Sequence, residues 1–366
     1  KSKRERKKML LILDQCETGL MERNVLANCF VHYDLKVELA KCCNGIATVY
    51  LAQYVPNGQH VAVKKYRMDK ANKEESVMIR DEILTMRQFN HPNIHSFYTA
   101  FVNNFELHLV APLMCFGSCK DTIRNCFSTG FPEIFVALIM RDVLSGLEYI
   151  HRRGYIHRSV RASHILLDQT KAVLSGFRDC TSFVAHGERA HTLHQLAPFS
   201  ARSLNWLAPE VLEQNIIGYT EKSDIYSVGI TCCELANGVE PFADLQPTFM
   251  FTEKIRGNVP TLLDRSTCPP KEINTNAGNV ESSVAAQAQQ IYCQRVFSDE
   301  FHQFTEICME KRPSNRWPAQ QLLSHSFFKQ CRATSIFDQL QRFGLETSDY
   351  SNDIKLQIDN AWEWEF

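Results

Sequence analysis

The sequence lacks any apolar run close to the about 20 residues that a bilayer span requires. Its 14 cysteines include no C-x-x-C pair, and no secretory leader is recognisable, so neither a zinc site nor a disulfide framework is favoured. The net charge is -1, which gives no electrostatic reason to expect nucleic acid or a membrane surface. We therefore expect reduced thiols, no bound metal, no nucleic-acid partner and no membrane insertion.

What is present suffices for a large core. The 366 residues are 44% hydrophobic and 10% aromatic, which allows one two-lobed domain or two ordinary domains. Residues 1–30 begin with six basic side chains in eight positions and are predicted to form a disordered basic tail. A nuclear-import or phospholipid-binding patch is the alternative. Residues 268–290, rich in Asn, Ser, Ala and Gln, are predicted to be a flexible insert.

Local patterns predict both strands and helices. The β-branched runs Thr48–Ala52 and His60–Lys64 flank Pro56-Asn57-Gly58, which is typical of a hairpin. Apolar residues then recur at helical spacing between Glu133 and Ile150, and predict a long buried helix.

The stretch after this helix carries the most specific pattern. Residues 157–167 read H-R-S-V-R-A-S-H-I-L-L, and residues 174–178 read L-S-G-F-R. This resembles the H-R-D-L-x-x-x-N and D-F-G motifs of protein kinases. The resemblance implies an α+β, bilobal protein-kinase-like fold. Its small β-rich N-lobe would span about 31–112, its larger, mainly helical C-lobe about 113–331, and a tail would occupy 332–366.

Three positions depart from the kinase motifs. Ser159 stands at the catalytic Asp, His164 at the magnesium-binding Asn and Gly176 at the magnesium-binding Asp. A serine hydroxyl is not a base near neutral pH, neutral histidine is a poor magnesium ligand, and glycine has no side chain to offer. We therefore predict a pseudokinase without catalytic residues, in which phosphoryl transfer is absent or very slow.

The same resemblance implies a nucleotide site. Lys64 ends a V-A-V-K run like the V-A-I-K motif, whose lysine grips the phosphates and pairs with a helical glutamate, here Glu82. The residues that would meet adenine are Val49, Ala62, Pro112, Met114 and Leu166. These apolar residues fit an empty pocket as well as a filled one.

The phosphates would meet unusual surroundings. Arg161 and Arg178, together with Lys64, place three positive charges that substitute in part for magnesium, because a guanidinium grips phosphate bidentately. Between Leu39 and Val49, however, most glycines of G-x-G-x-x-G are missing. We predict ATP binding without magnesium and without turnover, and a nucleotide-free scaffold is the alternative.

The kinase scaffold itself is retained in the sequence. Ala208-Pro209-Glu210 matches A-P-E, and Arg316 is the expected partner of Glu210. Residues at the positions of the kinase regulatory spine are Met86, Phe97, His157, Phe177 and Asp224. An unconventional active kinase is therefore a further alternative, supported by Lys64 and Glu82, which magnesium-dependent phosphate transfer would establish.

Four segments together narrow the resemblance. Residues 157–166, 222–230 and 234–238, with Trp364-Glu365-Phe366, are similar to the STRAD family, the sterile-20-related adaptor pseudokinases. That family implies allosteric activation of a liver-kinase-type tumour-suppressor Ser/Thr kinase, in a heterotrimer with a mouse protein-25 type helical-repeat scaffold. The scaffold would bind Trp364, Glu365 and Phe366, since exposed tryptophans are frequent interface hot spots. We expect a cytoplasmic protein linked to cell polarity, with the nucleus as an additional location.

Overall fold

The computed structural model describes residues 26–185, 188–190, 192–197, 202–214, 216–267 and 290–345. Within this range the chain forms two compact units, 26–115 and 116–345. Most of each of two predicted segments lies outside the described residues, namely 1–25 of the tail predicted over 1–30 and 268–289 of the insert predicted over 268–290. Trp364, Glu365 and Phe366 lie outside them as well.

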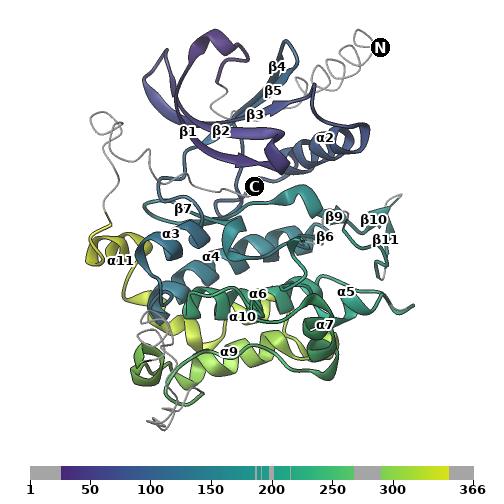
Figure 1. The fold of residues 1–366 in the computed structure, drawn as a ribbon, viewed down its shortest axis with the longest axis vertical. Coiled ribbons are helices and arrows are strands. Elements are labelled where there is room, and N and C mark those ends of the chain that lie inside the picture. Colours follow the sequence, from purple (N-terminus) through teal and green to yellow (C-terminus); the bar gives the residue numbers. More distant parts are fainter. Residues whose placement is uncertain are drawn as a thin grey trace, which may run out of the picture. The chain divides into compact units, whose positions relative to one another are not determined.

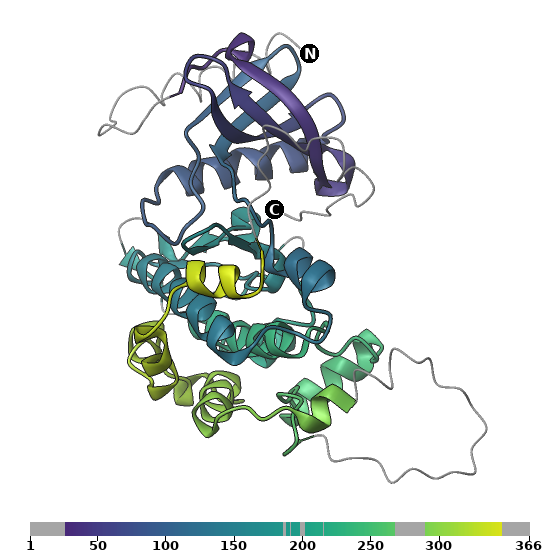
Figure 2. The same ribbon diagram turned by 90° about the vertical axis from the view of Figure 1, so that its left-hand side faces the viewer.

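The first unit is an antiparallel sheet with one helix. Its elements are η1 Phe30–His32, β1 Tyr33–Cys42, η2 Cys43–Gly45, β2 Ala47–Tyr54, β3 Gln59–Arg67, α2 Lys73–Arg87, β4 Thr99–Asn103 and β5 Glu106–Pro112. The strand order is β1-β2-β3-β5-β4, and α2 lies on one side of the sheet (Figure 1, Figure 2). β2 and β3 confirm the predicted hairpin.

Helix α2 begins with a capping box. Asn72 accepts the backbone N–H of Glu75, and the Glu75 carboxylate accepts that of Asn72, so the first turn satisfies two of its free donors. Ile79, Glu82, Ile83 and Met86 are buried and follow helical spacing. The cap thus fixes the register in which α2 turns Glu82 inward.

The second unit is mainly helical. Its helices are α3 Cys119–Cys126, α4 Glu133–Arg152, α5 Pro209–Glu213, α6 Lys222–Asn237, α7 Pro247–Arg256, α9 Asp299–Met309, α10 Ala319–Leu322 and α11 Ile336–Arg342, with the short η3 Ala162–His164, η4 Phe177–Asp179, η6 Pro313–Asn315 and η7 Ser326–Arg332. Its strands are β6 Tyr155–Ile156, β7 Ile165–Leu167, β8 Ala172–Leu174, β9 Thr181–Ser182, β10 Val184–Ala185 and β11 Glu188–Arg189. α4 confirms the predicted buried helix, and α6 packs against both α4 and α9 (Figure 1).

The folded part begins earlier than the sequence indicated. Residues 26–30 were assigned to the tail, yet Leu26 is buried in a core cluster with Tyr33 and Phe101. The Tyr33 hydroxyl donates a 2.8 Å hydrogen bond to the Ala27 carbonyl. These contacts cover apolar surface of the sheet, which residue-by-residue composition does not reveal.

The second unit also ends later than position 331. α11 packs on α4, with Ile336 and Leu340 almost fully buried. The Phe343 ring lies edge-on to Phe127, with centroids 5.1 Å apart. The first part of the predicted tail is therefore a helix of the fold.

Candidate functional site

Lys64 and Glu82 meet inside the first unit, as predicted. Lys64 Nζ lies 3.9 Å from Glu82 Oε1, and both side chains are buried. Burial alone would lower the pKa of Lys64, but the charge of Glu82 and the neighbouring Tyr66 raise it above its ordinary value. Lys64 is therefore a permanent cation held between β3 and α2.

The residues predicted to meet adenine in this unit fall into two groups. Val49 pairs with Lys64 across β2 and β3, so both side chains share one sheet face, and Ala62 is two positions away on the same face. Pro112 pairs instead with Val61 on the other face, and Met114 is buried just beyond β5. The structure thus gathers Val49, Ala62 and Lys64, while Pro112 offers this face only its backbone.

The segment between Leu39 and Val49, which lacks most glycines of the kinase G-x-G-x-x-G motif, contains a tight turn. η2 joins β1 to β2, and the Ile46 N–H donates to the Cys43 carbonyl at 3.1 Å. Cys43 and Gly45 both have positive φ, 56° and 79°. Only Gly45 adopts this conformation without strain, so Cys43 holds a conformation for which glycine is the usual residue.

The loop over 157–164 is anchored to α6 by Asp224. Its carboxylate accepts the backbone N–H groups of His157 and Arg158 at 2.8 Å each, and the His151 ring at 2.8 Å. Burial would raise the pKa of Asp224, but the hydrogen bond and charge of His151 and the His157 contacts hold it below its usual value. Asp224 is a fixed anion that organises the loop.

His157 and Phe177 link this loop to η4. The two rings lie edge to face with centroids 4.9 Å apart, and His157 Nε2 donates to the Ser175 carbonyl at 2.8 Å. The spine residues His157, Phe177 and Asp224 are thus brought together within the second unit. Leu166 is buried in β7 nearby, paired with Val173 of β8.

The Ser159 side chain is buried against Ser203. Its hydroxyl lies 3.0 Å from that of Ser203, and the residue is almost fully buried. Its carbonyl accepts a 2.7 Å hydrogen bond from His164 Nδ1. A neutral hydroxyl bonded to another hydroxyl supplies no general base.

Arg161 is held from three sides. Its guanidinium donates to His164 Nε2 at 3.1 Å and to the Arg202 carbonyl at 3.4 Å, and its carbon lies 5.8 Å from the centre of the Trp206 ring. Burial and the charges of Arg161 and, more weakly, Arg178 hold the pKa of His164 well below its usual value. His164 is therefore neutral, and two arginine charges act on one ring.

Glu234 of α6 joins the loop over 157–164 to Trp206, the residue whose ring lies against Arg161. Its carboxylate accepts the Ala162 N–H at 2.9 Å and Trp206 Nε1–H at 2.8 Å. Burial raises the pKa of Glu234 to about 7, although both hydrogen bonds favour the ionised form. Sequence reasoning did not identify this role of Glu234 and Trp206, although Glu234 begins the segment 234–238 and Trp206 stands two residues before the A-P-E motif.

Magnesium does not fit the residues at the three departing positions. Ser159, His164 and Gly176 present no carboxylate, the ligand that this hard cation prefers. A Cβ added at Gly176 would lie 2.4 Å from His164 Nδ1. In the part of the chain that the structure describes, no group of three or more His, Cys, Asp or Glu side chains could hold a metal ion.

The predicted pair Glu210–Arg316 is present. Arg316 donates to both carboxylate oxygens of Glu210, at 2.6 and 2.9 Å, and its Nε donates to the Glu310 carbonyl at 2.6 Å. The bidentate geometry and burial make this a rigid link between α5 and the segment before α10.

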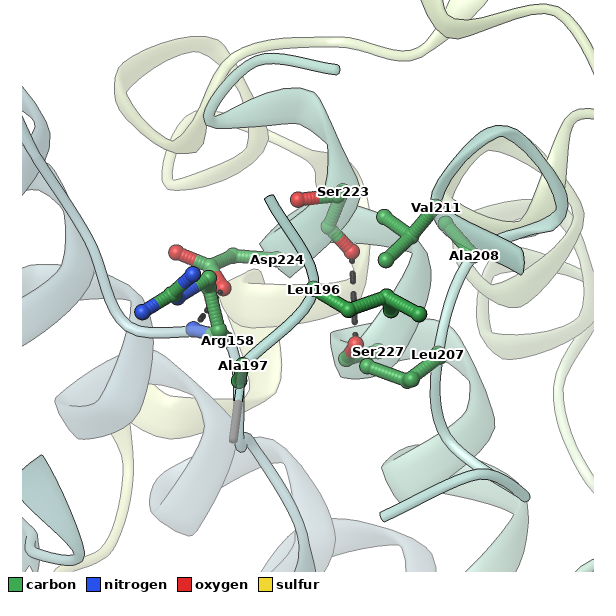
Figure 3. A pocket seen from close by; sticks show the side chains of 9 residues that line it. All are labelled: Arg158, Leu196, Ala197, Leu207, Ala208, Val211, Ser223, Asp224 and Ser227. Carbon is green, nitrogen blue, oxygen red and sulfur yellow. Dashed lines mark hydrogen bonds between the residues drawn. The ribbon is translucent and has the colours of Figure 1, made fainter. Parts of the chain in front are cut away.

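A further cluster fixes residues 193–197, which lie between η4 and α5. Leu193 and Tyr219 exchange backbone hydrogen bonds of 2.9 and 2.8 Å, and the Tyr219 hydroxyl donates to the Gln195 carbonyl. Arg158 donates to the carbonyls of Asp179 and Gln195 and to the Tyr219 hydroxyl. Figure 3 shows Arg158 beside Asp224, with Leu196 and Ala197 lining a small pocket. The three acceptors of the Arg158 guanidinium named above are thus neutral, while its backbone N–H bonds the Asp224 carboxylate.

The fold and the loops together define a protein kinase domain, and comparison with known proteins agrees, since residues 44–328 match the protein kinase domain family. Human STE20-related kinase adapter protein alpha is 39% identical over 366 residues, covering 91% of this chain and 84% of that protein. The chicken (Gallus gallus) alpha protein is 39% identical, covering 85% and 84%. Human STE20-related kinase adapter protein beta is 34% identical, covering 83% and 77%. The chain belongs to this family of STE20-related kinase adapter proteins, the STRAD family.

Among the described residues, no helix has the length and apolar character needed to cross a membrane.

Proposed function

We propose that this chain is a catalytically inactive adaptor that activates a partner Ser/Thr kinase of the liver-kinase tumour-suppressor type. Together with a mouse protein-25 type scaffold, the two would form a heterotrimer, which we place in the cytoplasm, additionally in the nucleus, and in cell polarity. The proposal is carried by the contrast between the catalytic positions and the scaffold. His164 fills the space beside Gly176, whereas the contacts of Asp224 and Arg316 and the Lys64–Glu82 pair expected of a kinase scaffold are present.

The relatives support the adaptor part, since their names describe kinase adapter proteins. Chemistry supports the inactive part. Ser159 cannot take a hydroxyl proton near neutral pH, and no carboxylate stands at 159, 164 or 176 to hold magnesium. Transfer would therefore have neither its base nor its main charge stabiliser.

Nucleotide binding is the second part of the proposal. Lys64 is a buried cation on the face that carries Val49 and Ala62, the Arg161 guanidinium donates to His164 Nε2, and Arg178 lies in η4 two residues after Gly176. We propose that ATP binds without magnesium, its adenine against Val49, Ala62, Leu166 and the backbone at Pro112 and Met114, and is not turned over. The Arg161 guanidinium is already hydrogen-bonded to His164 and to the Arg202 carbonyl. It would therefore attract the phosphates from a fixed position rather than move towards them.

Two reconstitutions test the adaptor role, one with an active partner kinase and one with a catalytically inactive variant of that kinase. We expect the active partner to gain activity in the trimer, and the inactive partner to leave no phosphate transfer in any combination. Radioactive phosphate transferred by this chain beside the inactive partner, in magnesium, would instead establish the unconventional kinase.

The thermal midpoint of the purified chain across an ATP titration tests the nucleotide part. A ligand that binds the native state raises this midpoint by mass action, so we expect equal rises in EDTA and in magnesium. Arg178→Ala and Arg161→Ala should each shift the titration to higher ATP. No rise in either buffer would favour the nucleotide-free scaffold.

A further inference from the structure

His164 and Gly176 meet in a way that their separation in the sequence hides. Gly176 has a φ of 78°, and a Cβ built on it would lie 2.4, 2.5 and 2.8 Å from Nδ1, Cγ and Cδ2 of His164. Real Cβ atoms do not approach other atoms within 3.0 Å. The imidazole therefore occupies the space into which any side chain at position 176 would project.

The imidazole is not free to move aside. Its Nδ1 donates to the Ser159 carbonyl at 2.7 Å, and its Nε2 accepts from Arg161 at 3.1 Å. The residue is 5% exposed. Rotating the ring would break both hydrogen bonds and leave the Arg161 guanidinium with one fewer acceptor.

We propose that His164 and Gly176 are one coupled exchange, in which the imidazole fills the space of a metal-binding side chain at 176 and, through its Nε2, fixes the Arg161 cation beside the ring. His164 is thus a positioning residue for Arg161. Gly176→Asp alone does not restore a metal site, because the His164 imidazole occupies the space of the new side chain. His164→Asn alone does not restore it either, because Gly176 has no side chain to offer a metal.

The steric part of this inference stands apart from the proposed function, and only its nucleotide part rests on it. Positive φ at Gly176 is itself a reason for glycine, so strain has to be separated from the clash. Gly344 provides the control, because it has a φ of 65° and no atom within 4 Å of an added Cβ.

A double-mutant cycle with alanine tests the steric part. Gly176→Ala should lower the thermal midpoint by about 5 °C more than Gly344→Ala does. With His164→Ala also present, most of that excess should disappear, whereas the effect of Gly344→Ala should not change. Equal effects of Gly176→Ala with and without the imidazole would overturn the coupling.

The metal part uses Gly176→Asp, His164→Asn and the two combined. The midpoint rise with ATP is compared in EDTA and in magnesium, and we expect only the double variant to show a larger rise with magnesium. A magnesium effect in Gly176→Asp alone would overturn the inference, and so would its absence from a double variant that binds ATP. Should neither the unchanged chain nor any variant bind ATP, the proposed nucleotide site fails, while the alanine cycle still decides the coupling.

Discussion

At the scale of single residues, the described structure has the charged pairs that hold the fold of a protein kinase. The loop over 157–164, by contrast, lacks the catalytic Asp that a kinase motif carries at position 159. Arg316 and Glu210 form a buried bidentate pair, and Asp224 accepts two hydrogen bonds from this loop and one from His151 of α4. Motif spacing predicted the first pair, because the two residue types stand at fixed places in a known frame. It did not predict that His164 and Gly176 touch, since contact depends on where two loops meet.

His108 gives a residue-scale prediction for pH. It is fully buried between the rings of Phe30 and Phe101, at 5.0 and 5.2 Å, and its Nε2 lies 3.6 Å from Glu106. Burial lowers its pKa to about 4, with Glu106 opposing and Lys65 adding to the shift. The unfolded chain therefore binds this proton first, and stability falls as pH drops from about 6.5 towards 4.

His108→Phe removes this proton and keeps a ring in the stack. Between pH 7.5 and pH 5.5 the unchanged chain should lose about 1.4 kcal/mol more unfolding free energy than the variant does. Urea unfolding at the two pH values measures this difference, and the comparison at pH 7.5 isolates the effect on packing. A difference between the proteins that stays constant with pH would contradict the prediction.

At the scale of elements, periodicity and turn residues predicted the β2–β3 hairpin and α4, because each needs only local sequence. The contacts of residues 26–30 and of α11 were not predicted. Both segments are stabilised by apolar surface on distant elements, β4 and β5 for the first and α4 for the second. The bridge between Leu193 and Tyr219 was not predicted either, because its backbone hydrogen bonds join two segments that lie apart in the sequence.

That bridge gives the element-scale prediction. Tyr219→Phe removes the hydroxyl that donates to the Gln195 carbonyl and accepts from Arg158. A loss of about 1 kcal/mol should raise amide hydrogen exchange over residues 193–197 about fivefold. Tyr98→Phe is the matched control, because its hydroxyl accepts a hydrogen bond from the Gln59 side chain at an exposed edge of the other unit. Unchanged exchange at 193–197 would show that the backbone bridge alone holds this segment.

At the scale of the whole molecule, an adaptor needs two separate partner surfaces. Each described unit is held by its own buried ions, the Lys64–Glu82 pair in the first and Asp224 and the Arg316–Glu210 pair in the second. In the proposed trimer, the scaffold is bound through Trp364, Glu365 and Phe366, which lie outside the described residues. The two surfaces should therefore be separable by mutation.

Alanine at both Trp364 and Phe366 should abolish capture of a mouse protein-25 type scaffold. Buried aromatic anchors are worth at least about 2 kcal/mol each at interfaces, so each single change should weaken binding about 30-fold. Phe337→Ala is the control, because this ring is a half-exposed aromatic on α11. Calorimetric titration measures the affinity, and the thermal midpoint confirms that the variants fold. The ATP-induced midpoint rise should not change, because the nucleotide site is proposed on other residues. Scaffold binding that survives both substitutions would remove the role given to these aromatic residues and leave the adaptor to bind through its folded units.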